Sequence, residues 1–348
     1  MTGKKISPSE FLGYRALLPV VDVRSPSEYL AGHIPSAVNI PLFNDTERAA
    51  VGLTYKVKGR EESVREGLKL IGPSLGEKFT EALRLSKGGR LLMYCWRGGM
   101  RSESMAWMLG LSGLTTFLLE GGYKAYRNHI LGQLASRRNI LILGGLTGSG
   151  KTAVLNLLGD RGEQVADLED IASHKGSAFG SLGQGQQPTT EQFANNLFDI
   201  WKRFDFDRTI WLEDESRNIG SVFLPEQFYR NMQESPVIAL ISRPEVRLPR
   251  LVEEYCCYPV EMLKASVMKI SRRLGGDRTG DAVRAIESGD LEKAAEIVLV
   301  YYDRTYLYSL EQRKNHMVHR INTDTADPEI NAARILEYAG KHNLLSAD

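Results

Sequence analysis

Cysteine is scarce in this sequence, which has 3 cysteines among 348 residues. So few cysteines cannot build a disulfide framework, which favours a reducing compartment. No apolar run approaches the length of a membrane span, and residues 1–10 are polar and lack the apolar core of a signal peptide. We therefore expect a cytoplasmic protein that has no membrane anchor.

Net charge is also nearly absent, because 44 basic residues are balanced by 43 acidic residues. This balance excludes a global basic field, so any nucleic-acid site must be a local patch. The chain is 42% hydrophobic and 25% charged, which is typical of a globular protein, and it is long enough for two domains. The basic pair Arg137 and Arg138 marks the boundary that we predict, with domains at residues 1–137 and 138–348.

The most informative stretch is residues 91–102, with the sequence L-L-M-Y-C-W-R-G-G-M-R-S. Its pattern predicts a buried strand that ends at Cys95, then a tight loop, then a helix. Gly98 and Gly99 would allow backbone N–H groups to turn inward, because glycine tolerates the φ values that such a nest requires. The helix N-terminus and the two arginines of the loop add positive potential. We therefore expect Cys95 to be a nucleophile rather than a buried structural cysteine.

The same loop is suited to a tetrahedral anion, because it gathers backbone N–H groups and guanidinium groups. The residues that we expect to hold the phosphate part of a donor are Trp96, Arg97, Gly98, Gly99, Met100 and Arg101. Cys95 and Arg101 also fit the C-x5-R pattern of the phosphate loop in cysteine phosphatases. A phosphatase therefore remains an alternative at this point.

The first part of the chain resembles a rhodanese domain. The resemblance is carried by D-V-R-S-P-S-E-Y at residues 22–29, A-G-H-I-P-S-A-V-N-I-P at residues 31–41, the Cys95 loop and L-E-G-G-Y at residues 119–123, in the order of that family. It implies an α/β domain with a parallel sheet, and a cysteine that carries sulfur or selenium. Residues 45–67 depart from it, because this charged segment is longer than a bare rhodanese domain requires. It is a solvated helical face, a lid or an RNA-contacting insertion.

A phosphate-binding loop opens the second part of the chain. Residues 145–152 match G-x-x-x-x-G-K-[ST], between the apolar run 139–143 and the helical pattern 153–158. A strand before and a helix after the motif are the context that indicates a P-loop, and so a P-loop NTPase-like α/β domain. The residues expected to hold a diphosphate are Gly145, Gly148, Ser149, Gly150, Lys151 and Thr152. Thr152 would bind Mg²⁺ if a metal is used.

Acidic residues follow the apolar run 209–212 in a position that suits a Walker B strand. Asp214 or Glu215 could hold a metal through water or orient a nucleophile. The alternative is an exposed acidic turn. The sequence does not establish whether a metal is required.

Basic residues are the candidates for contacts to RNA phosphates. The set that we expect is Arg48, Lys56, Arg217, Arg243, Arg247, Arg272, Arg273 and Arg304. The tyrosines of residues 301–308 could stack on bases, although a tyrosine stripe at helical spacing is more often part of a core.

The motifs taken together resemble the tRNA 2-selenouridine synthase family over nearly the whole chain. They include C-W-R-G-G-M-R-S, D-x-E-R-x-x-V-G, G-L-T-G-S-G-K-T, H-K-G-S-A-F-G and E-D-E-S-R-x-I-G. The resemblance implies the wobble uridine of tRNAs for Lys, Glu and Gln as substrate. It further implies geranylation of 2-thiouridine from geranyl diphosphate, then replacement of the S-geranyl group by selenium from selenophosphate, with Cys95 carrying selenium as a selenyl sulfide. No cofactor other than Mg²⁺ is indicated.

Three other functions remain open at the level of the sequence. The first is an ATP-coupled rhodanese-type tRNA sulfurtransferase, in which the P-loop binds a nucleotide. The second is a nucleotide-switched RNA-binding module with a degenerate rhodanese, which the intact Cys95 disfavours. The third is the phosphatase indicated by the C-x5-R pattern.

Overall fold

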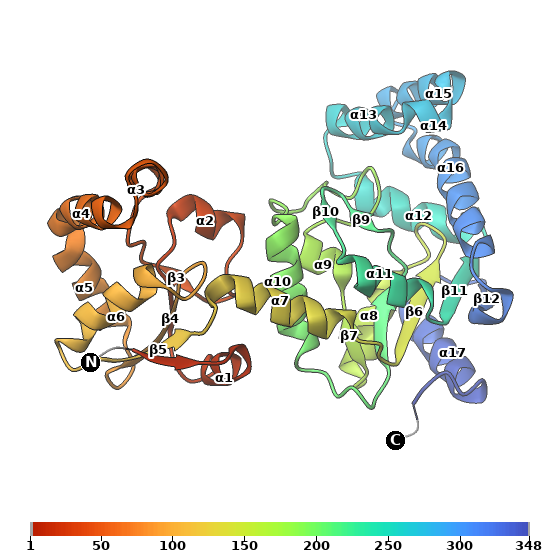
Figure 1. Cartoon of the computed structure of the whole chain (residues 1–348). Helices are drawn as coiled ribbons and strands as arrows, with labels where there is room; N and C mark the ends of the chain where they lie inside the picture. Colours follow the sequence, from red (N-terminus) through yellow and green to blue (C-terminus); the bar gives the residue numbers. More distant parts are fainter. Residues whose placement is uncertain (1–2, 347–348) are drawn as a thin grey trace. The chain divides into compact units, whose positions relative to one another are not determined.

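The computed structural model describes residues 3–346 and divides the chain into two compact units, Met1–Gln133 and Leu134–Asp348 (Figure 1). The division falls a few residues before the boundary expected after residue 137. Both units contain a parallel sheet covered by helices, so the predicted α/β class is confirmed. Among the helices formed by residues 3–346, none combines the length and apolarity needed to cross a bilayer.

The sheet of the first unit has five parallel strands in the order β1-β5-β4-β2-β3. The strands are β1 Lys4–Ile6, β2 Val20–Asp22, β3 Val38–Asn39, β4 Arg90–Tyr94 and β5 Thr115–Leu119. The helices are α1 Pro8–Tyr14, α2 Pro26–Ala31, α3 Asp45–Lys58, α4 Arg60–Ile71, α5 Leu75–Leu85, α6 Met100–Gly110 and α7 Gly122–Ala135, with a short 3-10 turn at Gly72–Ser74. The core joins alternate residues of β2 and β4 to α6, which places the end of β4 in the middle of the unit.

The charged segment at residues 45–67 folds as part of a helical hairpin made by α3 and α4. Asn44 caps α3 by accepting the N–H of Glu47, whose carboxylate accepts the N–H of Asn44 in return. Helix α3 buries none of its side chains, and Leu53 and Tyr55 are exposed on it. The interpretation as a solvated helical face therefore describes α3, whereas α4 buries Ile71 against the core.

The sheet of the second unit has five parallel strands in the order β12-β11-β6-β8-β7. Its strands are β6 Ile140–Gly145, β7 Gln164–Ala166, β8 Ile210–Glu213, β11 Val237–Ser242 and β12 Val318–Thr323, and β9 Asn218–Ile219 pairs separately with β10 Val222–Phe223. Helices α8 Lys151–Asp160 and α17 Pro328–Lys341 pack on one face of this sheet. The remaining helices before the C-terminal bundle are α9 Leu168–Ala172, α10 Thr190–Trp201 and α11 Glu226–Gln233.

A helical bundle extends this unit beyond the ends of the strands (Figure 1). It contains α12 Pro244–Tyr255, α13 Val260–Lys269, α14 Ser271–Leu274, α15 Gly276–Glu287 and α16 Leu291–Glu311. Residues of α13 to α16 form an apolar core that includes Val267, Ile286 and Val298. The long helix predicted near residues 291–310 is α16, and it runs from this bundle back towards the sheet.

Candidate active sites

Cys95 follows β4 directly and is only 3% exposed. The Ser102 hydroxyl lies 3.2 Å from the Cys95 sulfur and 3.1 Å from the carbonyl oxygen of Gly99. Its single proton can therefore be donated to either of them. Donation to the sulfur would place this hydroxyl as a polar partner of the cysteine that is expected to react. Ser102 was not among the expected site residues, although it completes the C-x5-R-S pattern.

The two glycines of the Cys95 loop have different conformations. Gly98 has φ +65°, in the left-handed region, whereas Gly99 has φ −109°, which any residue adopts. The conformational argument for Gly99 is therefore wrong, and this residue instead precedes α6 and accepts backbone N–H groups of its first turn. A second left-handed glycine of the site comes from elsewhere. Gly122 has φ +62°, and a Cβ there would lie 2.4 Å from the carbonyl oxygen of Cys95.

The two arginines of the loop also differ. Arg97 is exposed, whereas Arg101 is largely buried and bound by Glu28 of α2. The Arg101 Nη1 atom lies 2.6 Å from Glu28 Oε2, and Nη2 lies 3.3 Å from Oε1. Burial alone would raise the pKa of Glu28, but the hydrogen bonds and charge of Arg101 outweigh it and lower that pKa. An anion in the loop would therefore have to share Arg101 with Glu28.

The remaining residues of the predicted donor loop border the same cysteine. Trp96 is half-buried and its ring lies 5.9 Å from that of Tyr123, while Met100 is exposed. The backbone N–H of Tyr123 donates to the carbonyl oxygen of Cys95 at 2.8 Å. The first turn of α7 therefore holds the backbone of Cys95 in place through this hydrogen bond.

The P-loop lies between β6 and α8, as predicted from its motif. Gly148 and Gly150 have φ +82° and φ +85°, so the loop has the backbone that a phosphate cradle requires. Lys151 Nζ donates to the carbonyl oxygen of Gly145 at 3.1 Å. The Ser149 hydroxyl is buried and has no hydrogen-bond partner within the described part of the chain. An unpartnered buried hydroxyl at this position fits a loop that binds an anion.

Carboxylates surround the base of the P-loop. Glu169 accepts the hydroxyl of Thr152 at 3.4 Å, and its own backbone N–H donates to Glu213 at 3.1 Å. Burial, and then the charge of Glu169, raise the pKa of both Glu213 and Glu215 well above its usual value. The charge of Lys151 opposes this rise at Glu215. Lys151 and Glu215 are therefore close enough to interact, which agrees with the expected position of Glu215.

Asp214 lines the space over the P-loop together with Glu215, but its hydrogen-bond partners come from the end of α16. Its Oδ1 atom lies 2.6 Å from Arg313 Nη2, and its Oδ2 atom accepts the hydroxyl of Tyr306 at 3.2 Å. Asp214 therefore fixes the end of α16 to the sheet. To hold a metal, as expected from the sequence, Asp214 would have to release Arg313 and Tyr306.

No cluster of three or more acidic, histidine or cysteine side chains in residues 3–346 has the arrangement of a metal cage. Mg²⁺ at phosphate sites needs fewer protein ligands, because it is usually held by one or two carboxylates together with substrate phosphates and water. Thr152 and Glu169 are the groups that would serve a Mg²⁺–diphosphate complex here, with Glu215 beside them.

A cavity of about 1030 Å³ opens over the P-loop. It is bordered by Lys151 and Glu215 and also by two cations that were not expected at this site, Lys175 and Arg250. Arg250 Nη1 would lie 3.0 Å from a Cβ built on Gly150, so this guanidinium covers the phosphate loop. Lys175 forms an ion pair with Glu254 at the rim. Lys175 belongs to the H-K-G-S-A-F-G motif, whereas Arg250 lies outside the quoted motifs, and only the fold shows that both border the P-loop cavity.

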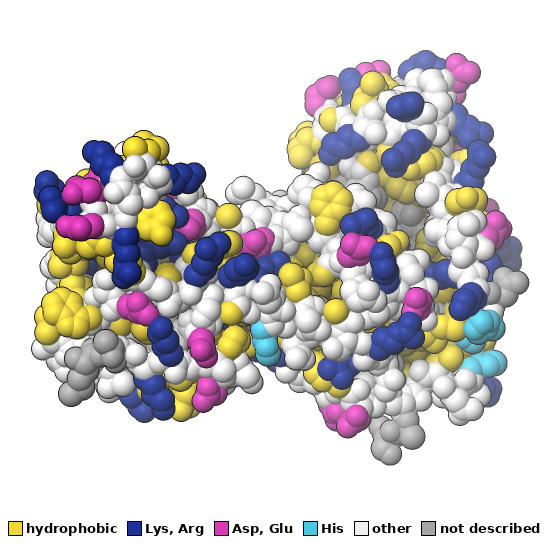
Figure 2. Space-filling model, viewed as in Figure 1, with side chains coloured by type: hydrophobic (Ala, Val, Ile, Leu, Met, Phe, Trp, Pro, Cys, Tyr) yellow, Lys and Arg dark blue, Asp and Glu magenta, His cyan; other side chains and the backbone are white. Residues whose placement is uncertain are grey.

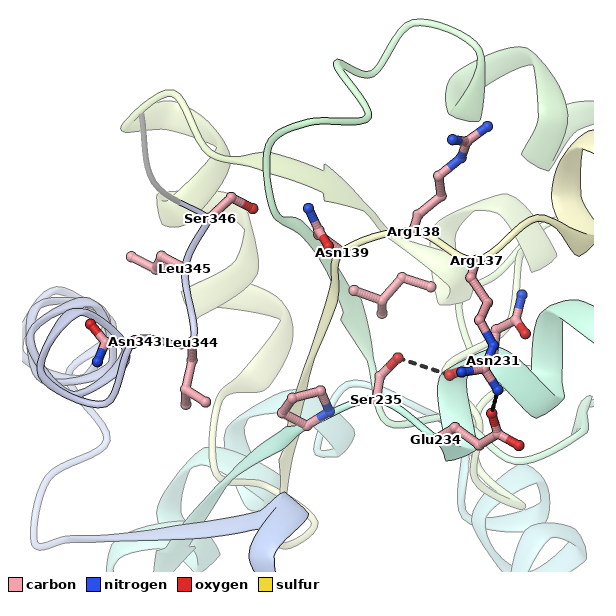
Figure 3. A pocket seen from close by; sticks show the side chains of 12 residues that line it. Arg137, Arg138, Asn139, Asn231, Glu234, Ser235, Asn343, Leu344, Leu345 and Ser346 are labelled. Carbon is pink, nitrogen blue, oxygen red and sulfur yellow. Dashed lines mark hydrogen bonds and ion pairs between the residues drawn. The ribbon is translucent and has the colours of Figure 1, made fainter.

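A second cavity of about 320 Å³ lies at the end of the same sheet where the strands begin, away from the P-loop (Figure 3). It is lined by Asn139, Ser235 and Leu345, near the points where β6 and β11 begin. Ligands of parallel α/β sheets bind at the carboxyl ends of the strands, where the P-loop is. This cavity is therefore not part of the phosphate site.

Most of the predicted RNA contacts lie at the surface, where basic side chains are spread over the region of α13 to α16 (Figure 2). The exposed ones are Lys56, Arg217, Arg243, Arg272, Arg273 and Arg304, and Arg48 is half-buried. Arg273 Nη1 donates to the hydroxyl of Tyr301 at 3.2 Å. The prediction that Arg247 contacts RNA is wrong, because this side chain is 1% exposed and its guanidinium is bound by Asp303 inside the protein. It therefore cannot contact RNA in this conformation.

Comparison with known proteins identifies the family. The family model "Rhodanese-like domain" matches residues 9–129, and "tRNA 2-selenouridine synthase AAA domain" matches residues 138–333. The tRNA 2-selenouridine synthase of Bordetella petrii is 35% identical and covers 86% of this chain and 89% of its own length. That of Shewanella frigidimarina is 34% identical, with 90% and 95% coverage, and that of Sulfurovum sp. is 32% identical, with 87% and 92%. The chain therefore belongs to the tRNA 2-selenouridine synthases, a family of tRNA-modifying enzymes.

Proposed function

We propose that this enzyme converts wobble 2-thiouridine in tRNA to 2-selenouridine in two steps, geranylation of the sulfur and then selenation. The observation that carries the proposal is the combination of a cysteine loop and a P-loop in one chain of this family. A thiocarbonyl sulfur is a poor leaving group, and alkylation converts it into a departing thiol. Geranylation from geranyl diphosphate releases diphosphate, which is the anion that a P-loop suits.

In the first step the P-loop would hold the diphosphate without hydrolysing a nucleotide. The uridine sulfur attacks C1 of the geranyl group, a C–S bond forms, and the C–O bond breaks with its electron pair leaving on diphosphate. Lys151, Arg250 and the N-terminus of α8 would stabilise the charge that develops on this leaving group. Mg²⁺, if bound through Thr152 and Glu169, would neutralise more of the same charge.

In the second step selenophosphate would lie in the loop around Cys95. Attack of the sulfur on selenium forms the S–Se bond of a selenyl sulfide and breaks the Se–P bond, so phosphorus leaves with the electron pair as phosphite. A thiol must then return two electrons when selenium is delivered to the uridine C2.

The Ser102 hydroxyl 3.2 Å from the Cys95 sulfur, together with the C-x5-R pattern, favours a second form of this step. Attack of Cys95 on phosphorus forms an S–P bond and releases selenide for the uridine without a change in oxidation state. Hydrolysis of the S–P bond then gives phosphate. Phosphorus NMR of the products decides between the two forms, because phosphite indicates attack on selenium and phosphate indicates attack on phosphorus.

The division of labour is tested with Lys151→Ala and Cys95→Ala, using nucleoside mass spectrometry of thiolated tRNA. Lys151→Ala should abolish geranylation and leave selenation of pre-geranylated tRNA largely intact. Cys95→Ala should stop at S-geranyl-2-thiouridine. Loss of both steps in Lys151→Ala would refute the assignment of the P-loop to geranylation. Turnover that requires ATP would instead favour the ATP-coupled sulfurtransferase.

For the partner, we propose tRNA bound partly through the exposed basic residues, with tRNAs for Lys, Glu and Gln as the expected substrates. Each phosphate contact that is lost should reduce the slope of log Kd against log salt concentration by about 1. Lys56→Ala and Arg273→Ala are suitable variants because both side chains are exposed. An unchanged slope in either variant would remove that residue from the interface.

A further inference from the structure

A narrow apolar pocket lies between α12, α13, α15 and α16. Its lining includes Leu251 of α12, Leu263 of α13, Ile286 of α15 and Val298 of α16. Its volume of about 70 Å³ is several times the roughly 10–15 Å³ that one water needs. A chain of several carbons therefore has room to lie along it.

The pocket adjoins the cavity over the P-loop. Thr147, Ser177, Leu251, Tyr255 and Tyr302 line both of them, and Thr147 is itself a residue of the loop. Leu251 Cγ would lie 2.9 Å from a Cβ built on Gly148, so this apolar side chain packs directly against the phosphate-binding backbone. A molecule with a diphosphate at one end and an apolar tail at the other can therefore occupy both spaces at once.

The walls of the pocket disfavour a nucleotide base. A purine has ring nitrogens and an amino group that need hydrogen-bond partners when buried. The hydroxyl of Tyr302 already accepts the N–H of Ala178 at 2.9 Å. The other walls are mainly hydrocarbon, which is the surface that an isoprenoid chain needs.

We propose that this pocket binds the geranyl chain of geranyl diphosphate while the P-loop binds the diphosphate. The inference rests on the proposed function and adds the residues that select the chain. The small side chains of Ala294 and Ala295 on α16 keep the pocket open, because larger side chains at these positions would extend into it. The pocket therefore sets the length of the isoprenoid that the enzyme accepts.

Ala295→Phe tests the proposal, because Ala295 is only partly buried and a larger side chain has space to enter the pocket. The KM for geranyl diphosphate should rise roughly 10-fold or more, since one methylene in an apolar pocket is already worth about this factor. The shorter dimethylallyl diphosphate should be affected much less. Val300→Phe is the matched control, because Val300 lies on the same helix but is 48% exposed and outside the pocket.

Competition by inorganic diphosphate separates this inference from the proposed function. If diphosphate competes equally in the wild type and in Ala295→Phe, the P-loop is intact and the protein is folded. An unchanged KM for geranyl diphosphate under that condition would overturn the pocket and leave the proposed function standing. A wild type in which diphosphate does not compete with geranyl diphosphate would overturn the proposed function itself.

Leu299→Ala provides a second test in the opposite direction. Removal of this side chain should widen the pocket and raise the relative use of farnesyl diphosphate, a longer isoprenoid. The ratio of farnesyl to geranyl transfer is measured on the full chain. A ratio equal to that of the wild type would count against the pocket, even if Ala295→Phe does not fold. ATP competition that is lost in Ala295→Phe would place a base there instead.

Discussion

Arg247 offers the sharpest test of how the helical bundle is held over the P-loop. Its guanidinium donates to the carbonyl oxygens of Ser242 and Thr147 at 3.0 Å and 2.9 Å. It also forms a bidentate pair with Asp303, with distances of 2.9 Å and 2.6 Å. One side chain of α12 thus connects the end of β11, the P-loop and α16. Arg247→Met should therefore loosen all three connections while leaving an apolar side chain of similar length.

The size of the effect follows from burial. Removal of one partner of a buried ion pair costs about 3–5 kcal/mol, because the other charge is left without a partner. The Asp303 side chain is 23% exposed, so water can partly solvate it in the variant, and we expect the lower end, about 3 kcal/mol. For a unit of this size that loss corresponds to a decrease in Tm of roughly 6–12 °C.

Calorimetry of the full chain measures this decrease, with Arg304→Met as the control. Arg304 is the next residue after Asp303 and is exposed, so its removal should change the free energy of unfolding by less than about 0.5 kcal/mol. The combined variant Arg247→Met with Asp303→Asn should lose less than the sum of the single losses, because the unpaired charge is gone. An effect of Arg247→Met as small as that of the control would refute this account of the bundle.

Three other substitutions test local parts of the two sites. Gly122→Ala should destabilise the first unit and inactivate Cys95, because the new Cβ would lie 2.4 Å from the carbonyl oxygen of Cys95. Gly76→Ala is the control, because a Cβ there has no atom within 4 Å. It should leave Cys95 alkylation unchanged and leave stability unchanged or slightly higher. Ser102→Ala should slow alkylation of Cys95, since the hydroxyl 3.2 Å from the sulfur is removed; an unchanged rate would exclude a role for this contact. Burial and the neighbouring carboxylates raise the pKa of Glu213 in the folded protein, so its contribution to stability is present at low pH and is lost as the pH rises above the usual value of about 4.3. Glu213→Gln should therefore raise the Tm near pH 7 and lose this advantage towards pH 4, and a Tm difference that does not vary with pH would contradict the assignment.

The motifs were sufficient to predict the loops of both sites. The Cys95 loop and the P-loop each have a strand before them and a helix after them, as their patterns indicated. Such units are local, because the apolar run, the glycines and the helix N-terminus lie within a dozen residues or so. The elements and the α/β class could therefore be predicted from the sequence alone.

Contacts between distant residues could not be predicted in the same way. Arg247 looked like one of several basic surface residues, and its partner Asp303 is 56 positions away in the chain. Gly122 was part of a family motif, but nothing local shows that its backbone lies against Cys95. Among the acids after β8, Asp214 and Glu215 both line the space over the P-loop, but nothing local shows that Arg313 and Tyr306 bind Asp214.

Arg101 and Lys151 already have anionic or carbonyl partners, and this determines what a phosphate group can gain from them. Arg101 is bound by Glu28, and Lys151 donates to a backbone carbonyl close to carboxylates whose pKa is raised. A phosphate group that binds Arg101 must share it with a carboxylate, so the net gain is smaller than that of a new charge pair. If diphosphate binds at the P-loop, as proposed, a cation that accompanies it would offset the repulsion from the carboxylates beside Lys151. An anion at Cys95 would instead meet the backbone N–H groups of its loop.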